Sequence, residues 1–180
     1  MKYSITLLVL LISLVSCKSD REKKSGKIAA IEHELKTDTT GKINFTRASE
    51  IIKLYEEYVA AFPDDTLSPG YLFKAADVSA HIHNTEYAIN LYHRVIKEYP
   101  KYRKVPQAWF YIGFLYDNEL KNYPEARNAY ETLLNKFPEY EQRTTVEWLL
   151  ANLGKSDIEL AKQLQSGQTN SADSSALEVK

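Results

Sequence analysis

The chain has almost nothing that could hold a fold together covalently, and its positive and negative charges nearly cancel. Among its 180 residues Cys17 is the only cysteine, so no disulfide can form within the chain. Lys and Arg number 23, Asp and Glu number 24, and the formal net charge is −1. Because a nearly neutral chain has no general attraction for phosphate backbones, we expect no nucleic-acid partner.

Glycine and proline are also scarce, at six residues each, whereas tyrosine is abundant at 13. A tyrosine can bury its ring and keep its hydroxyl in water, which suits helices that pack on one side only. The hydrophobic content of 44% is ordinary for a folded domain. The composition therefore favours a folded helical domain rather than a disulfide scaffold or a nucleic-acid-binding protein.

A single long apolar run, Ile5 to Val15, follows Lys2 and precedes a polar stretch. It is too short to span a bilayer comfortably, and a positive residue before a short apolar segment is typical of a signal peptide. We expect residues 1–16 to be such a signal. The polar, charged residues that follow predict a flexible tether over residues 17–26.

The end of this run, Leu14-Val15-Ser16-Cys17, resembles the lipobox of bacterial lipoproteins. In that family the cysteine is lipidated and becomes the N-terminus after the preceding peptide is removed. The resemblance implies lipidation at Cys17 and attachment to the bacterial outer membrane, facing the periplasm or the cell surface. The alternative is an ordinary signal peptide in which Cys17 is incidental.

Two segments 38 residues apart, 88–100 and 126–138, repeat one pattern of Ala, Asn, Tyr and Pro, and a third copy ends at Pro63. Apolar residues recur in each at intervals of three or four, which predicts an amphipathic helix that its proline ends. A further apolar helix is expected before each of the last two copies, around residues 71–78 and 108–116.

These helices resemble the tetratricopeptide repeat (TPR). Trp109, Ile112-Gly113 and Tyr116 resemble the W-x2-L-G-x2-Y pattern of its helix A. Ala126, Tyr130 and Pro138 resemble positions of helix B. In the middle copy, Tyr71 and Ala75 are aligned with Trp109 and Gly113, and Val78 with Tyr116.

The resemblance implies an all-α, TPR-like helical-hairpin solenoid of about three repeats over residues 27–165. A C-terminal capping helix is expected near residues 141–152, with Gly154 at its end. The polar residues 166–180 predict a disordered tail.

The resemblance also implies a concave surface lined by helix-A residues outside the core. By the alignment above, the residues predicted to bind a partner are Phe110, Phe114, Asp117 and Asn118 in the last repeat and Leu72, Ala76, Ser79 and Ala80 in the middle one. Phe110 and Phe114 are i, i+4 neighbours and would form one aromatic stripe. The alternative is that this stripe is core, covered by a neighbouring helix.

We find little sign of catalytic or metal chemistry in the sequence. His81 and His83 point to different sides of a helix, and no further ligand lies at suitable spacing, so solvated histidines are favoured over a metal site. The adjacent carboxylates Glu56-Glu57 and Asp64-Asp65 do not face each other across a cleft. We therefore expect no enzyme, cofactor, metal or small-molecule substrate.

Together these features resemble small Bacteroidetes TPR lipoproteins. A more distant resemblance is to the TPR lipoprotein of the outer-membrane β-barrel assembly machine and to the TPR domain linked to the Tol–Pal system. They imply a membrane-anchored adaptor that binds other cell-envelope proteins. The alternative is a structural or accessory spacer in an envelope complex, without a peptide-binding groove.

Overall fold

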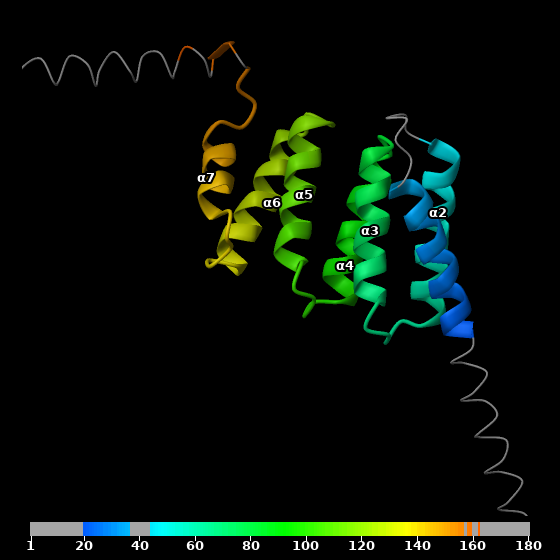
Figure 1. Ribbon diagram of the computed structural model, residues 1–180. Helices are drawn as coiled ribbons and strands as arrows, with labels where there is room; N and C mark the ends of the chain where they lie inside the picture. The colour runs from blue at the N-terminus through cyan, green and yellow to red at the C-terminus, as the bar shows by residue number, and fades with distance from the viewer. Residues whose placement is uncertain (1–19, 37–43, 157, 160–161, 163–180) are drawn as a thin grey trace, which may run out of the picture. The chain divides into compact units, whose positions relative to one another are not determined.

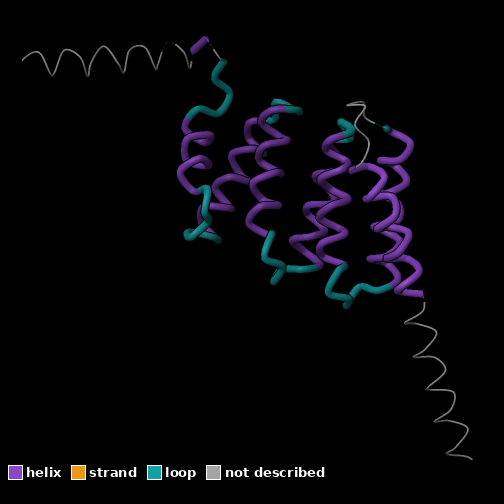
Figure 2. Tube along the Cα trace, viewed as in Figure 1, coloured by secondary structure: helices purple, strands orange, loops and turns teal. Residues whose placement is uncertain are grey.

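The computed structural model describes residues 20–36, 44–156, 158–159 and 162, and every regular element in these ranges is a helix (Figures 1 and 2). The expected all-α helical-repeat fold is confirmed for this part of the chain. The predictions for residues 1–19, including lipidation at Cys17, and for the tail 166–180 lie outside it. The labelled helices are α2 (Phe45–Ala61), α3 (Ser68–His81), α4 (Thr85–Glu98), α5 (Val105–Asn118), α6 (Tyr123–Lys136) and α7 (Arg143–Ala151).

A further helix, the N-terminal helix of residues 20–36, precedes α2 and corrects the predicted tether. Arg21 forms an ion pair with Asp65, and Lys24 Nζ lies 3.7 Å from a carboxylate oxygen of Glu57. Ile28 and Ile31 are buried. Residues 20–26 looked like a linker because they are polar, but an outward helical face is polar as well.

The three B helices, α2, α4 and α6, end in the same way. Their C-cap residues, Phe62, Tyr99 and Phe137, have nearly identical backbone angles, and each donates its N–H to the carbonyl four residues earlier. Pro63, Pro100 and Pro138 follow directly. Because proline has no N–H and clashes with a continuing helix, the repeated aromatic-proline pair fixes the end of every B helix.

Tyrosines fill the core of the helical hairpins, although the hydroxyl oxygens of Tyr58 and Tyr130 are buried and not in water as expected. Tyr58, Tyr92 and Tyr130 are among the largest fully buried side chains. Tyr58 packs edge-on against Tyr71, with ring centroids 4.8 Å apart, and Tyr92 packs on Phe73 at 5.4 Å. These contacts bring α2 and α4 against the two sides of α3, so that α3 is covered from both neighbouring B helices.

The chain forms two compact units, Met1–Tyr111 and Ile112–Lys180, and α5 passes from one into the other. In the second unit, α6 packs against α7 through the buried Val146. The capping helix was expected near 141–152 and is observed over Arg143–Ala151. Gly154 follows with φ +79°, a conformation that glycine adopts without steric cost.

Candidate functional site

The two best-defined repeats differ in length by one residue, and this decides which side chains are equivalent. Helices α3 and α5 begin 37 residues apart, whereas α4 and α6 begin 38 apart. The extra residue therefore lies in the turn between α5 and α6. It precedes Lys121, whose φ of 52° matches that of His83 at 58° in the turn between α3 and α4.

This register corrects the predicted partner-binding residues of the middle repeat. With a spacing of 37, the helix-A pattern residues Trp109, Ile112, Gly113 and Tyr116 align with Leu72, Ala75, Ala76 and Ser79. None of these four residues of the middle repeat has any exposed surface. Leu72 and Ala76 are core residues, so the prediction that they contact a partner is wrong. The error arose because the 38-residue spacing of the B helices was carried back through a turn that differs in length.

The residues predicted in the last repeat are more accessible. Phe114 is 40% exposed, and Asn118 Nδ2 donates a hydrogen bond to the Phe114 carbonyl at 3.1 Å. Burial raises the pKa of Asp117, and the nearby Lys121 offsets this only in part. Phe110, which belongs to the first unit, is half-buried and has its ring 5.6 Å from that of Tyr111. Partner binding by these residues stays a prediction.

The helix-A side of the first unit carries a polar and aromatic cluster that the sequence did not single out. Lys74 Nζ lies 2.6 Å from a Glu32 carboxylate oxygen, and the Tyr55 hydroxyl donates to the same oxygen at 2.7 Å. The rings of Tyr55 and Tyr71 stack, and Lys74 lies over both. Desolvation would raise the pKa of Glu32, but the bonds from Lys74 and Tyr55 outweigh it and lower that pKa.

A second carboxylate of this cluster, Asp77, lies one turn further along α3. The Tyr92 hydroxyl donates to Asp77 Oδ1 at 2.5 Å. Burial raises the pKa of Asp77, and the bond from Tyr92 and the charge of Lys104 counteract this only partly. Lys104 Nζ itself lies 4.5 Å from the centre of the Phe73 ring. The cations and carboxylates on this side therefore bind one another and the rings beneath them.

The sequence contained a signal for this cluster that the one-residue register error concealed. Tyr55, Tyr92 and Tyr130 occupy the same position of successive B helices. In the corrected register Asp77 is equivalent to Phe114, so the same helix-A position bears a carboxylate in one repeat and an aromatic ring in the next. Recognising Asp77 required the length of a turn that the sequence alone did not fix.

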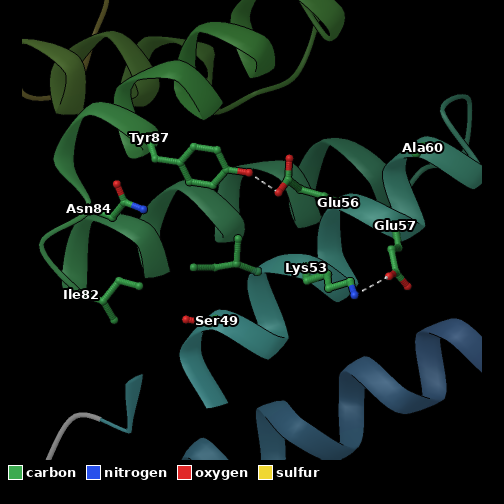
Figure 3. A pocket seen from close by; sticks show the side chains of 9 residues that line it. Ser49, Lys53, Glu56, Glu57, Ala60, Ile82, Asn84 and Tyr87 are labelled. Carbon is green, nitrogen blue, oxygen red and sulfur yellow. Dashed lines mark hydrogen bonds and ion pairs between the residues drawn. The ribbon is translucent and has the colours of Figure 1, made fainter. Parts of the chain in front are cut away.

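A cavity of about 560 Å³ lies between α2 and the start of α4 (Figure 3). The Tyr87 hydroxyl donates to Glu56 at 2.5 Å, and this bond together with burial raises the pKa of Tyr87 to about 12. Arg94 Nη1 lies 2.9 Å from Glu56. The lining residues are Ser49, Ile52, Lys53, Glu56, Glu57, Ala60, Ile82, Asn84 and Tyr87. Its polar groups are largely engaged with one another, so the cavity presents no evident chemistry of its own.

The described residues contain no group of three or more His, Cys, Asp or Glu side chains arranged to hold a metal ion. His81 is the last residue of α3, and its Nδ1 lies 2.8 Å from the Asp77 carbonyl. Glu56 and Asp65 are held in separate ion pairs, with Arg94 and Arg21. Over the same ranges, no helix is both long enough and apolar enough to cross a membrane.

Comparison with known proteins agrees with this geometry. A family model described as the tetratricopeptide repeat matches residues 71–102 and 107–140, which hold the α3–α4 and α5–α6 hairpins. A comparison with curated proteins gives no match. The matched segments have the helix pairs, the buried small residues of helix A and the B-helix ends that the repeat requires. The two hairpins within residues 71–140 are therefore similar to tetratricopeptide repeats.

Proposed function

We propose that this protein is a lipid-anchored adaptor that binds other proteins of a bacterial cell envelope. The observation that carries the proposal is the family match across α3–α6, because stacked helical hairpins of this type present extended surfaces suited to protein partners. The proposal assigns no catalytic activity to the chain.

The sequence of the N-terminus supports the anchor and the location. A short apolar segment ends at Cys17 with a lipobox-like pattern, and Cys17 is the only cysteine. Two or three acyl chains would hold the chain stably at an outer membrane, whereas a single chain would bind reversibly. Partners would then be met at high effective concentration, so modest affinity for each is sufficient.

The accessible aromatic residue of the second unit is our candidate for the partner contact. Phe114 is 40% exposed and lies one turn before Asn118 on α5, with Asp117 beside it. A large exposed ring flanked by an amide and a carboxylate suits an apolar anchor residue of a partner peptide with polar groups around it.

The spacer alternative is supported by the helix-A side of the first unit. There the side chains that would otherwise face a ligand already have partners within the protein. Glu32 and Asp77 accept hydrogen bonds from tyrosines, and Lys74 and Lys104 lie over aromatic rings. A surface whose polar groups are already paired gains little from binding a peptide, because those bonds must first be broken. This observation favours a rigid spacer for the first unit.

Crosslinking in the native envelope distinguishes the two functions. We expect the variant Phe114→Ser to lose crosslinked partners while keeping its helical content. Leu120→Ser is the matched control, because Leu120 is 38% exposed in the same unit but lies after the end of α5. Equal crosslinking by both variants would reject the adaptor surface and favour the spacer.

The anchor has a separate test. Cys17→Ser should abolish incorporation of radiolabelled palmitate and release the protein from the membrane fraction. Unchanged fractionation together with an unchanged mass would rule out the lipoprotein assignment.

A further inference from the structure

The N-terminal helix is fixed to the body of the first unit close to the proposed lipid. Its described part begins three residues after Cys17. Arg21 pairs with Asp65 in the turn after α2, and Lys24 pairs with Glu57 near the end of α2. The start of the helix therefore lies close to the first hairpin.

The length of chain between Cys17 and this helix limits how far the unit can be from the membrane. Three residues span at most roughly 10 Å even when fully extended. An acylated Cys17 would therefore hold the near end of the first unit against the lipid headgroups. This step rests on the anchor of the proposed function.

The near end of the first unit is formed by turns of the repeat. The turn 62–67 joins α2 to α3, the turn 99–104 joins α4 to α5, and both lie at the end where the N-terminal helix starts (Figure 1). The Tyr99 hydroxyl donates to the Pro63 carbonyl at 3.0 Å and links the two turns. The turn 82–84 lies at the opposite end, away by the length of the 14-residue helix α3, roughly 20 Å.

The turn 99–104 has the composition of a membrane-contacting segment. It contains Lys101, Arg103 and Lys104 together with two tyrosines, and no acidic residue. Lys101 and Arg103 are exposed, and neither forms an ion pair with a described residue. Cations attract anionic lipids, and tyrosines favour the boundary between headgroups and water.

The neighbouring turn 62–67 adds apolar surface and little net negative charge. Leu67 is 39% exposed at the start of α3. Of the two acidic residues in this turn, Asp65 is neutralised by Arg21, and Asp64 is exposed. On the N-terminal helix, Lys23 Nζ lies 4.0 Å from Asp20 Oδ1, and Glu22 is exposed.

We propose that the turns 62–67 and 99–104 form a docking surface for the anionic phospholipid headgroups of the membrane that holds the anchor. Lys101 and Arg103 contact the phosphates, and Leu67 lies at the headgroup boundary. The helices of the first unit then point away from the bilayer, with the turn 82–84 outermost.

The experiment uses residues 17–180, the proposed mature chain, coupled through Cys17 to a maleimide lipid in vesicles. Because the chain contains no other cysteine, the attachment is unique. Hydrogen–deuterium exchange is compared between phosphatidylglycerol-containing and pure phosphatidylcholine vesicles. We expect slower exchange in the turns 62–67 and 99–104 on the anionic vesicles, and unchanged exchange in the turn 82–84.

Charge reversal tests the named residues. In Lys101→Glu/Arg103→Glu the protection of both turns should fall at least about fivefold, since each cation near an anionic surface contributes about this factor. Lys36→Glu is the control, because Lys36 is exposed at the far end of the N-terminal helix. Equal protection of near and far turns, or protection unaffected by the double reversal, would overturn the proposal.

Chemical coupling to the vesicle keeps this test independent of the proposed function. If Cys17 is not acylated in the cell, the Cys17→Ser experiment reports that separately. If Cys17 is acylated but the turns are not protected, the anchor stands and only the docking surface fails.

Discussion

The middle and last repeats share one backbone pattern, but they differ at the helix-A position held by Asp77 and Phe114. Asp77 is half-buried and accepts a bond from Tyr92, the tyrosine of its own B helix. Phe114 is 40% exposed, and the equivalent tyrosine, Tyr130, packs against Gly113 instead. The same helix-A position is thus bonded to the B helix in the middle repeat and exposed to solvent in the last repeat.

This difference shows where a repeat can vary without loss of its fold. The B-helix ends, the buried small residues and the buried tyrosines are kept in both hairpins because they determine how the two helices approach. Side chains on the outer side of helix A carry no such constraint. A binding surface can therefore differ between repeats that have the same core.

The largest expected effect tests the assignment of Leu72 to the core. Leu72 has no exposed surface, so Leu72→Ala should lower the free energy of unfolding by about 2–5 kcal/mol. Phe114→Ala, which removes a partly exposed ring, should cost less than about 1 kcal/mol. Urea denaturation of both variants gives the comparison. Equal losses would mean that the two repeats do not differ as described.

The next largest effect concerns the close approach of helices in the last repeat. A Cβ added at Gly113 would lie 2.5 Å from a ring carbon of Tyr130, so Gly113→Ala should destabilise by about 1–3 kcal/mol. Gly70→Ala in α3 is the control, since its Cβ would meet only the Tyr102 hydroxyl at 3.6 Å. Both variants are compared by thermal unfolding. A lower melting temperature for Gly70→Ala than for Gly113→Ala would contradict this packing.

A smaller effect tests where the first unit begins. Gly26 lies inside the N-terminal helix, and a Cβ there would meet nothing within 4 Å. Gly26→Ala should therefore raise the free energy of unfolding by about 0.5–1 kcal/mol, because alanine loses less conformational entropy in a helix. A flexible tether would show no change in the denaturation midpoint.

The smallest effect concerns the pH dependence that Asp77 gives to the middle repeat. Burial raises its pKa in the folded state, so its contribution to stability is complete below the unfolded value of about 3.9 and is lost as pH rises through the folded pKa. Asp77→Asn keeps an acceptor for Tyr92 and removes the charge. The free energy of unfolding of this variant minus that of the native chain should be larger at pH 7 than at pH 3.

Parallel measurements on Phe114→Asn complete that comparison. Phe114 cannot titrate, so its variant should differ from the native chain by the same amount at both pH values. A pH-independent difference for Asp77→Asn as well would mean that Asp77 has an ordinary pKa.

Much of the fold could be predicted because each signal was local. The proline after each B helix fixes a helix end wherever it occurs, and the spacing of apolar residues in α4 and α6 gives the buried face directly. Trp109, Gly113 and Tyr116 identified helix A of the last repeat on the same grounds. That register left open whether Phe114 is covered or accessible, and in the structure it is 40% exposed.

The remaining site could not be predicted, because it depends on turn length and on packing partners. One extra residue between α5 and α6 displaced the alignment of α3, so Leu72 and Ala76 were predicted as surface and Asp77 was missed. Residues 20–26 were predicted to be a tether because the ion pairs of Arg21 and Lys24 are with Asp65 and Glu57, which are distant in sequence.

The sequence by itself determined the all-α repeat and the end of every B helix, because proline geometry and amphipathic spacing act within a few residues. Only the tertiary structure decided which helix-A side chains are covered and that residues 20–26 belong to the folded unit. Burial and ion pairing depend on which distant residues meet, and that information appears only once the hairpins have packed together.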